Sequence, residues 1–383
     1  MDKKRVPLGD YVTEYSVRNK SDEDIPVYSV TNSQGFCTEY FDKEVASKDK
    51  KTYKIVPRGY FAYNPSRINV GSVDWQRCED RVIVSPLYNV FYVSEEMDQQ
   101  YLYYFLRSDI GRQMIKAKAS GSVRDNLKMD MLKEMTIPYK TFEEQKKCVA
   151  TLDELQKIIA LREKEIEKLD DLIKARFVEL FGNPDINEKG WNIYKMEKLC
   201  EVGSSKRIYQ NEQSMTGIPF LRISDLVNRM DTDSKECDLY IPEERFEELK
   251  EQGLVPVEGD ILLTARGTLG RCYIVQEADQ FYFQDGMITW LSNYDKKITA
   301  LYISYLFSMP GFRKQIDALQ AGSTVAYLSI SMTKKLDIMV PPIELQNQFA
   351  DFVKPVDKSK VAVQKALEES QLLFDSLMQE YFG

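Results

Sequence analysis

Two stretches of this chain are copies of one another: SGSVRDNLKMDMLKEM at residues 120–135 and AGSTVAYLSISMTKKL at residues 321–336. They align without a gap at an offset of 201 residues. The same offset relates identical residues spread along the chain, namely Leu127 and Leu328, Met131 and Met332, Gln145 and Gln346, and Phe181 and Phe382. A repeat of this kind indicates two similar structural units in one chain.

Composition and length favour a soluble protein of two or more domains. The chain has 383 residues, of which 43% are hydrophobic and 29% are charged. No apolar run approaches the roughly 20 residues needed to cross a bilayer, and the N-terminal MDKKRVPLGD lacks the apolar core of a signal peptide. The six cysteines form no CxxC pair, so we expect reduced thiols and a cytoplasmic location.

Several catalytic classes are excluded by what the sequence lacks. The chain contains no histidine, which removes Ser–His and Cys–His nucleophile pairs and Cys/His zinc sites. It has no P-loop, no dinucleotide fingerprint and no NPPY-like tetrapeptide, the nearest match being Asn64-Pro65-Ser66-Arg67. Catalysis by carboxylates, by lysine or by a bound cofactor remains possible on these grounds.

Charge is distributed unevenly along the chain. The net charge is −8, yet residues 1–140 carry 22 basic and 20 acidic side chains, a net of +2. Binding of nucleic acid depends on a local basic face, so the global acidity does not exclude DNA. The acidic remainder of the surface favours an additional protein partner.

The repeat divides the chain into four segments of two kinds. Residues 1–141 and 183–342 contain short strand-like runs rich in Tyr, Phe and Val, each followed by a helical stretch. Residues 142–182 and 343–383 are long, charged and helical in pattern. The sequence therefore predicts an α+β protein with two globular domains and two long helices.

Both long segments carry an apolar seam with alternating steps of three and four residues, which is typical of a coiled coil. The seam positions are Leu152, Leu155, Ile159, Ile166, Leu169, Ile173, Val353, Val356, Val363, Leu367, Phe374 and Leu377. Equal seams with a domain between them favour an antiparallel helix pair and a pseudo-two-fold arrangement of the domains. The alternative is that each helix packs on its own domain.

Three kinds of segment are candidates for contact with DNA. The first is FAYNPSRINVGSV at 61–73, where Asn64, Arg67 and Asn69 carry side chains that read base edges. The second is GDILLTARGTLGRCYIV at 259–275, with Arg266, Thr268 and Arg271 around two glycines. Taken alone, each segment favours the alternative, a strand–turn–strand unit whose arginines face solvent.

The third candidate is the repeated Gly-Ser loop, whose hydroxyls and amides suit phosphate or base contacts. An equally good interpretation is a turn at a helix end that is kept for packing. The candidate residues are Ser122, Arg124, Asn126 and Lys128 in the first copy, and Ser323, Thr324 and Tyr327 in the second. Framework residues match between the copies, whereas Arg124 aligns with Val325 and Asn126 aligns with Tyr327, as expected for a common scaffold with two different targets.

Taken in order, these features resemble the DNA-specificity subunit of type I restriction–modification systems. The resemblance rests on FAYNPSRINVGS, GDILLTARGTLG, the paired GSxxxxL loops, the helix entries IPYKTFEEQ and VPPIELQNQ, and the ELFG and EYFG ends. It covers nearly the whole chain. It implies two target-recognition domains separated by two long antiparallel helices that form a coiled coil.

The resemblance also implies a subunit that is not itself an enzyme, with no catalytic residue, metal site or cofactor in this chain, and it implies a function and partners. Each domain would read one half of a bipartite double-stranded DNA site, and the coiled coil would set the gap between the halves. Modification subunits, two copies as a rule, would bring S-adenosylmethionine, and a motor-nuclease restriction subunit would bring ATP and Mg. Two alternatives stay open: a coiled-coil protein scaffold without DNA specificity, and part of a fused modification enzyme.

Overall fold

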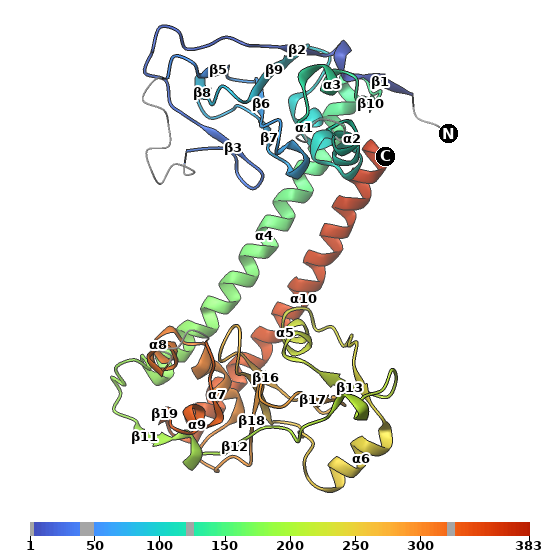
Figure 1. Ribbon diagram of the computed structural model, residues 1–383. Helices are drawn as coiled ribbons and strands as arrows, with labels where there is room; N and C mark the ends of the chain where they lie inside the picture. The colour runs from blue at the N-terminus through green and yellow to red at the C-terminus, as the bar shows by residue number, and fades with distance from the viewer. Residues whose placement is uncertain (1–3, 39–49, 120–125, 320–325) are drawn as a thin grey trace. The chain divides into compact units, whose positions relative to one another are not determined.

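The computed structural model describes residues 4–38, 50–119, 126–319 and 326–383 (Figure 1). The chain forms two compact units. Unit 1 comprises Met1–Glu165 and Val363–Gly383, and unit 2 comprises Ile166–Ala362. Each unit therefore contains one globular domain together with part of both long helices. The mixture of strands and helices in both units confirms the predicted α+β class.

A four-stranded antiparallel sheet lies at the centre of each unit, with the same strand order in both. In unit 1 the order is β2 (Val12–Glu14), β9 (Asn89–Val93), β6 (Phe61–Tyr63) and β7 (Val73–Trp75). In unit 2 it is β12 (Glu201–Gly203), β18 (Ile288–Ser292), β15 (Ile261–Thr264) and β16 (Cys272–Ile274). The predicted contact segments 61–73 and 259–275 thus form the same pair of adjacent strands and the loop between them.

The elements that flank each sheet along the chain are also repeated. Unit 1 has α1 (Gln99–Arg107), α2 (Asp109–Ala119), α3 (Met129–Lys133), β1 (Arg5–Pro7) and β10 (Thr136–Pro138). Unit 2 has α7 (Ala300–Ser308), α8 (Pro310–Leu319), α9 (Ile330–Lys334), β11 (Asn192–Lys195) and β19 (Asp337–Val340). Helices α1 and α7 begin in the same way. The side chains of Asp98 and Thr299 each accept a hydrogen bond from the backbone amide three residues later in the chain.

The remaining elements differ between the units. Unit 1 adds β3 (Ser29–Thr31), β4 (Gly35–Cys37), β5 (Lys54–Pro57) and β8 (Arg81–Val84). Unit 2 adds β13 (Ile218–Leu221), α5 (Ile223–Thr232), β14 (Tyr240–Ile241), α6 (Glu243–Glu251) and β17 (Tyr282–Phe283). Short 3-10 turns are η1 (Leu8–Asp10), η2 (Ile68–Val70), η3 (Met196–Lys198) and η4 (Gln210–Glu212). A common framework therefore carries two unrelated accessory lobes.

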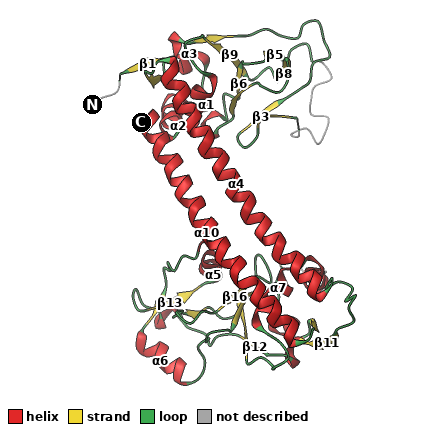
Figure 2. Cartoon of the chain, turned by 180° about the vertical axis from the view of Figure 1, so that it is seen from behind, coloured by secondary structure: helices red, strands yellow, loops and turns green. Residues whose placement is uncertain are grey.

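The long helices are α4 (Phe142–Phe181) and α10 (Ile343–Phe382), each of 40 residues and continuous (Figure 2). They run antiparallel, because residues in the first half of α4 contact late residues of α10, and late residues of α4 contact early residues of α10. In unit 1 the Arg162 guanidinium donates to Ser370 and to the Ala366 carbonyl. In unit 2 the Lys360 Nζ lies 2.6 Å from the Asp170 carboxylate. The twelve predicted seam residues are all buried or half-buried.

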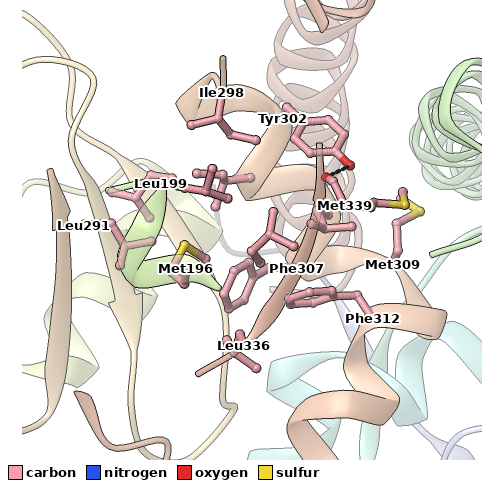
Figure 3. Close-up of a cluster of buried hydrophobic side chains, with 14 of the residues drawn as sticks. Met196, Leu199, Leu291, Ile298, Tyr302, Phe307, Met309, Phe312, Leu336 and Met339 are labelled. Carbon is pink, nitrogen blue, oxygen red and sulfur yellow. Dashed lines mark hydrogen bonds between the residues drawn. The ribbon is translucent and has the colours of Figure 1, made fainter. Parts of the chain in front are cut away.

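Each helix end also packs into a domain core, so the alternative arrangement is present together with the helix pair. In unit 1, Cys148 and Leu152 of α4 join Phe382 of α10 in one buried cluster. In unit 2, the Phe177 ring of α4 stacks on Tyr302, with centroids 5.5 Å apart, and meets Phe349 of α10 edge-on. The Tyr302 hydroxyl is satisfied by the Met339 carbonyl at 2.9 Å, inside the cluster drawn in Figure 3.

The matched glutamines tie each helix to the loop that precedes it. Gln145 donates to the carbonyls of Glu96 and Lys140 and accepts from the Asp98 amide, all within 3.0 Å. Gln346 makes the same three bonds with Lys297, Pro341 and Thr299. Both side chains are almost completely buried. The repeat therefore preserves a bonding pattern as well as a sequence.

Candidate nucleic-acid interface

The loop between β6 and β7 presents the first set of candidate residues. Asn64 accepts from the amide and hydroxyl of Ser66 at 3.1 and 2.9 Å, and this local turn leaves Arg67 and Asn69 exposed. Gly71 closes the loop with φ of 96°, a left-handed conformation that favours glycine. The loop therefore has a defined backbone that carries exposed donors and acceptors.

This loop is bonded to the segment that follows the first Gly-Ser pair. The Leu127 amide donates to the Pro65 carbonyl at 3.0 Å, and the Tyr63 hydroxyl donates to the Leu127 carbonyl at 3.1 Å. Burial raises the pKa of Tyr63 well above its usual value, so the phenol stays neutral and keeps its proton for this bond. Asn126 and Lys128 flank Leu127 and so lie beside the β6–β7 loop.

Unit 2 repeats this arrangement with different side chains. The Leu328 amide donates to the Ala265 carbonyl at 2.9 Å, and Arg266 pairs with Tyr327 in a backbone bridge. The Arg266 guanidinium lies 5.1 Å from the centroid of the Tyr327 ring, a cation–π contact. Two candidates that are 61 residues apart in sequence are thus in direct contact.

The turn between β15 and β16 is held by its own threonine. The Thr264 hydroxyl donates to the Thr268 carbonyl at 2.5 Å and accepts from the Arg271 amide at 3.0 Å. Thr268 is exposed at the turn. The Arg271 guanidinium forms an ion pair with Asp231 at 2.5 Å. That hydrogen-bonded pair lowers the pKa of the Asp231 carboxyl, and it leaves Arg271 with less charge to offer a phosphate.

Four of the candidates lie outside the residues that the structure describes: Ser122, Arg124, Ser323 and Thr324. The others fall into two groups, one in each unit, at equivalent places on the shared framework. The group in unit 1 is Asn64, Arg67, Asn69, Asn126 and Lys128. The group in unit 2 is Arg266, Thr268, Arg271 and Tyr327.

Sequence reasoning missed an aromatic and basic cluster in unit 1. The Arg77 guanidinium lies 4.4 Å from the Trp75 ring centroid and 5.8 Å from that of Tyr103. Arg107 covers the same Tyr103 ring at 5.3 Å. Trp75 and Arg77 directly follow the first candidate segment, which was an available signal. The sequence contained no such signal for Arg107, because its contact depends on how α1 packs beside β7.

A cavity of about 1100 Å³ lies elsewhere in unit 2. Its lining includes Glu197, Glu201, Glu258 and Glu277. Carboxylates repel phosphate, so this cavity is unsuited to nucleic acid. Among the described residues, no group of three or more Cys, Asp or Glu side chains could hold a metal ion, and no helix is long and apolar enough to cross a membrane.

The family model for the type I restriction modification DNA specificity domain matches this chain twice, over residues 10–171 and 188–370. The chain belongs to this family. Each match contains one of the sheets and one of the candidate loops described above. The repeat seen in the sequence is therefore a duplication of the family's own domain.

Relatives and solved structures agree with that assignment. A putative type I restriction enzyme specificity subunit of Haemophilus influenzae is 29% identical over 51% of this chain, and the match spans 48% of that relative. The type I restriction enzyme MjaIX specificity subunit of Methanocaldococcus jannaschii is 24% identical over 73% of this chain and 67% of the relative. The chain thus spans about half the length of the first of these relatives.

Two solved structures have the same fold. The S subunit of a type I restriction–modification system from M. genitalium matches with a TM-score of 0.59 and 14% identity, over 100% of this chain and 96% of that one. A chain from a structure of type I restriction–modification complex assembly and conformational transition matches with a TM-score of 0.57 and 15% identity. That match covers 99% of this chain and 97% of the other.

Proposed function

We propose that this chain is the sequence-specific DNA-recognition subunit of a type I restriction–modification complex. The observation that carries the proposal is the same framework presenting different polar side chains at one place in both units. The β6–β7 loop of unit 1 carries Asn64, Arg67 and Asn69, and the equivalent β15–β16 turn of unit 2 carries Arg266 and Thr268. Such a pair suits a bipartite target with two unlike half-sites, each read by one unit.

The partners in this proposal are double-stranded DNA, modification subunits in two copies, and a restriction subunit. Support comes from the family match and from the similarity to a chain solved in a structure of type I complex assembly. In this proposal the chain works in the cytoplasm and is not itself an enzyme. S-adenosylmethionine belongs to the modification subunit, and ATP with Mg belongs to the restriction subunit.

The test is to determine the methylome, which is the set of methylated bases in the DNA of the host. The chain would be co-expressed with its modification subunit in a host that lacks methylation, and modified bases would be identified by long-read sequencing. We expect one bipartite motif with a fixed gap, which disappears when this chain is omitted. Methylation with no motif, or a motif independent of this chain, would overturn the proposal and favour a scaffold without DNA specificity.

Domain exchange assigns each half-site. Replacing residues 6–140 with the equivalent part of a family member should change one half of the motif and leave the other half unchanged. The reciprocal exchange of residues 190–342 is the matched control, and it should change only the second half. If either exchange altered both halves or neither, the proposal that each unit reads its own half-site would be wrong.

A further inference from the structure

The β3–β4 hairpin is the part of the unit 1 accessory lobe that reaches the candidate loop. Its tip consists of Asn32, Ser33 and Gln34, all exposed. A small cavity of about 110 Å³ lies between hairpin and loop, and residues of both line it, including Asn32, Asn64 and Arg67. Asn32 of the hairpin tip therefore lies beside Asn64 and Arg67 of the predicted DNA-contact loop.

Three contacts fix the hairpin against this loop. The Ser72 hydroxyl donates to the Val30 carbonyl at 2.5 Å. The Phe36 amide donates to the buried Asp74 carboxylate at 3.1 Å. A Cβ added at Gly35 would lie only 2.0 Å from that carboxylate, so the close approach requires glycine. These bonds set the strand positions without involving the side chains at the tip.

Arg107 supplies the contact at the tip itself. Its Nη2 donates to the Asn32 carbonyl at 2.9 Å, and its guanidinium lies on the Tyr103 ring. Gly71 lies close to both residues. A Cβ atom added at this glycine would be 3.8 Å from the Asn32 Cβ and 3.9 Å from the Arg107 Cζ. Arg107 thus holds the hairpin tip beside the end of the β6–β7 loop.

We propose that the β3–β4 hairpin is a second DNA-reading element of unit 1, with Asn32 and Gln34 as specificity-determining residues and Arg107 as the residue that positions them. Amide side chains pair with adenine through two hydrogen bonds, and here Asn32 lies beside Asn64 and Arg67, with Gln34 exposed two residues further along the same tip. Unit 2 has no equivalent hairpin among its described residues, and Ser308 stands where the repeat places Arg107. The two half-sites would therefore be read by different numbers of elements.

This inference rests on the proposed function, and one experiment separates the two. Complexes of the full chain with its modification subunit would be prepared as wild type, as Asn32→Ala with Gln34→Ala, and as Arg107→Ala. The control is Gln252→Ala, which changes an exposed glutamine of unit 2. Each complex would be analysed by methylome and by binding to duplexes that carry single base-pair changes.

We expect the tip variant to lose roughly 5-fold to 150-fold of its discrimination at one or two base pairs of the first half-site. The second half-site and the gap should stay as in wild type, which also shows that the complex is folded. Arg107→Ala should relax the same positions, and Arg107→Lys should restore them in part. Gln252→Ala should change neither half-site.

Two results would overturn the hairpin proposal alone. One is unchanged discrimination at every first-half position in the tip variant. The other is a uniform loss of affinity for all duplexes, which indicates phosphate contact without base reading. A wild-type complex without any bipartite motif would overturn the proposed function and the hairpin proposal together.

Discussion

At the scale of single residues, the repeat preserves chemistry that periodicity does not reveal. Gln145 and Gln346 were visible as a matched pair, but an amide near the start of a charged helix is ordinarily solvated. The structure shows both buried, and each uses its oxygen and its nitrogen to bond backbone groups that the fold leaves without partners. Their identity in both units follows from that geometry.

Replacing Gln346 with alanine should lower the free energy of unfolding by about 1–3 kcal/mol. The substitution leaves the Thr299 amide and the Pro341 and Lys297 carbonyls without their partner in a buried place. Denaturant unfolding of the full chain measures the change. Gln364→Ala is the matched control, because Gln364 is exposed on the same helix. Equal effects of the two substitutions would contradict the assigned role.

Alkaline pH should destabilise unit 2 through Tyr282. Burial raises the pKa of Tyr282 from 10.0 to about 12 in the folded chain. The unfolded chain ionises first, so the stability present below pH 10 is progressively lost as pH rises from 10 to 12. Unfolding midpoints measured across this range should fall. Tyr282→Phe should reduce the slope, whereas Tyr209→Phe, at an exposed tyrosine, should leave it unchanged.

At the scale of elements, the apolar seam could be predicted from sequence, but the neighbours of each helix end could not. Steps of three and four residues show which face is buried, and the structure buries that face. They do not say what covers it. Phe382 illustrates this limit. In the sequence it was noticed only as part of the EYFG ending of the second long helix, yet its ring packs against Tyr101 and Phe105, with ring centroids 5.0 and 6.0 Å away.

Phe382→Ala should cost about 3–5 kcal/mol, because it leaves a cavity in the fully buried core of unit 1. Hydrogen exchange of α1 and β10 reports the loss locally, and denaturant unfolding reports it for the whole chain. Leu372→Ala on the exposed face of the same helix is the control and should change stability by less than about 0.5 kcal/mol. Unaltered protection of α1 in the Phe382 variant would contradict this packing.

The polar contacts inside the seam mark the pairing partner of each helix. Arg162 occupies a position where the pattern calls for an apolar residue, and it meets Ser370 of α10. The repeat places Val363 at the position of Arg162 and Leu169 at that of Ser370, so two copies of α4 could not make this contact. Arg162→Leu should leave stability similar or higher while weakening the preference of α4 for α10. A weakened preference would let α4 helices of two chains pair with each other and form a dimer. Mixing chains that carry different labels, followed by mass spectrometry, would detect such dimers in the variant, and the wild-type chain should form none.

At the scale of the whole molecule, the duplication and the fold class could be predicted, whereas the accessory lobes could not. Strand-like runs such as FAYN and MITWL gave the strands, but short runs carry no information about order in a sheet. Among the described residues the lobes have no counterpart in the other unit, so the repeat could not place them. The contact of Arg266 with Tyr327 could not be predicted either, because it depends on how the segment after α8 packs against the β15–β16 turn.

Helix length should control the gap in the DNA target. We expect that one additional heptad in both α4 and α10, inserted after Glu165 and after Ala362, lengthens the unread gap by about three base pairs. Seven residues add roughly 10 Å, against about 3.4 Å per base pair, and a heptad keeps the seam in phase. The methylome gives the gap directly. Replacing an existing heptad with the inserted sequence is the control, and an unchanged gap in the lengthened, active complex would show that the helices do not set it.

The location of Phe382 in the core of unit 1 has a consequence for biosynthesis. The ribosome makes the first domain early, yet the aromatic ring that fills that domain's core is specified some 240 codons later than the last residue of α3–β10, Pro138. Until then the nascent first domain exposes the apolar surface around Tyr101 and Phe105. The core of the first domain can therefore be completed only after residue 382 has been synthesised, and a chain truncated before Phe382 leaves that core unfilled.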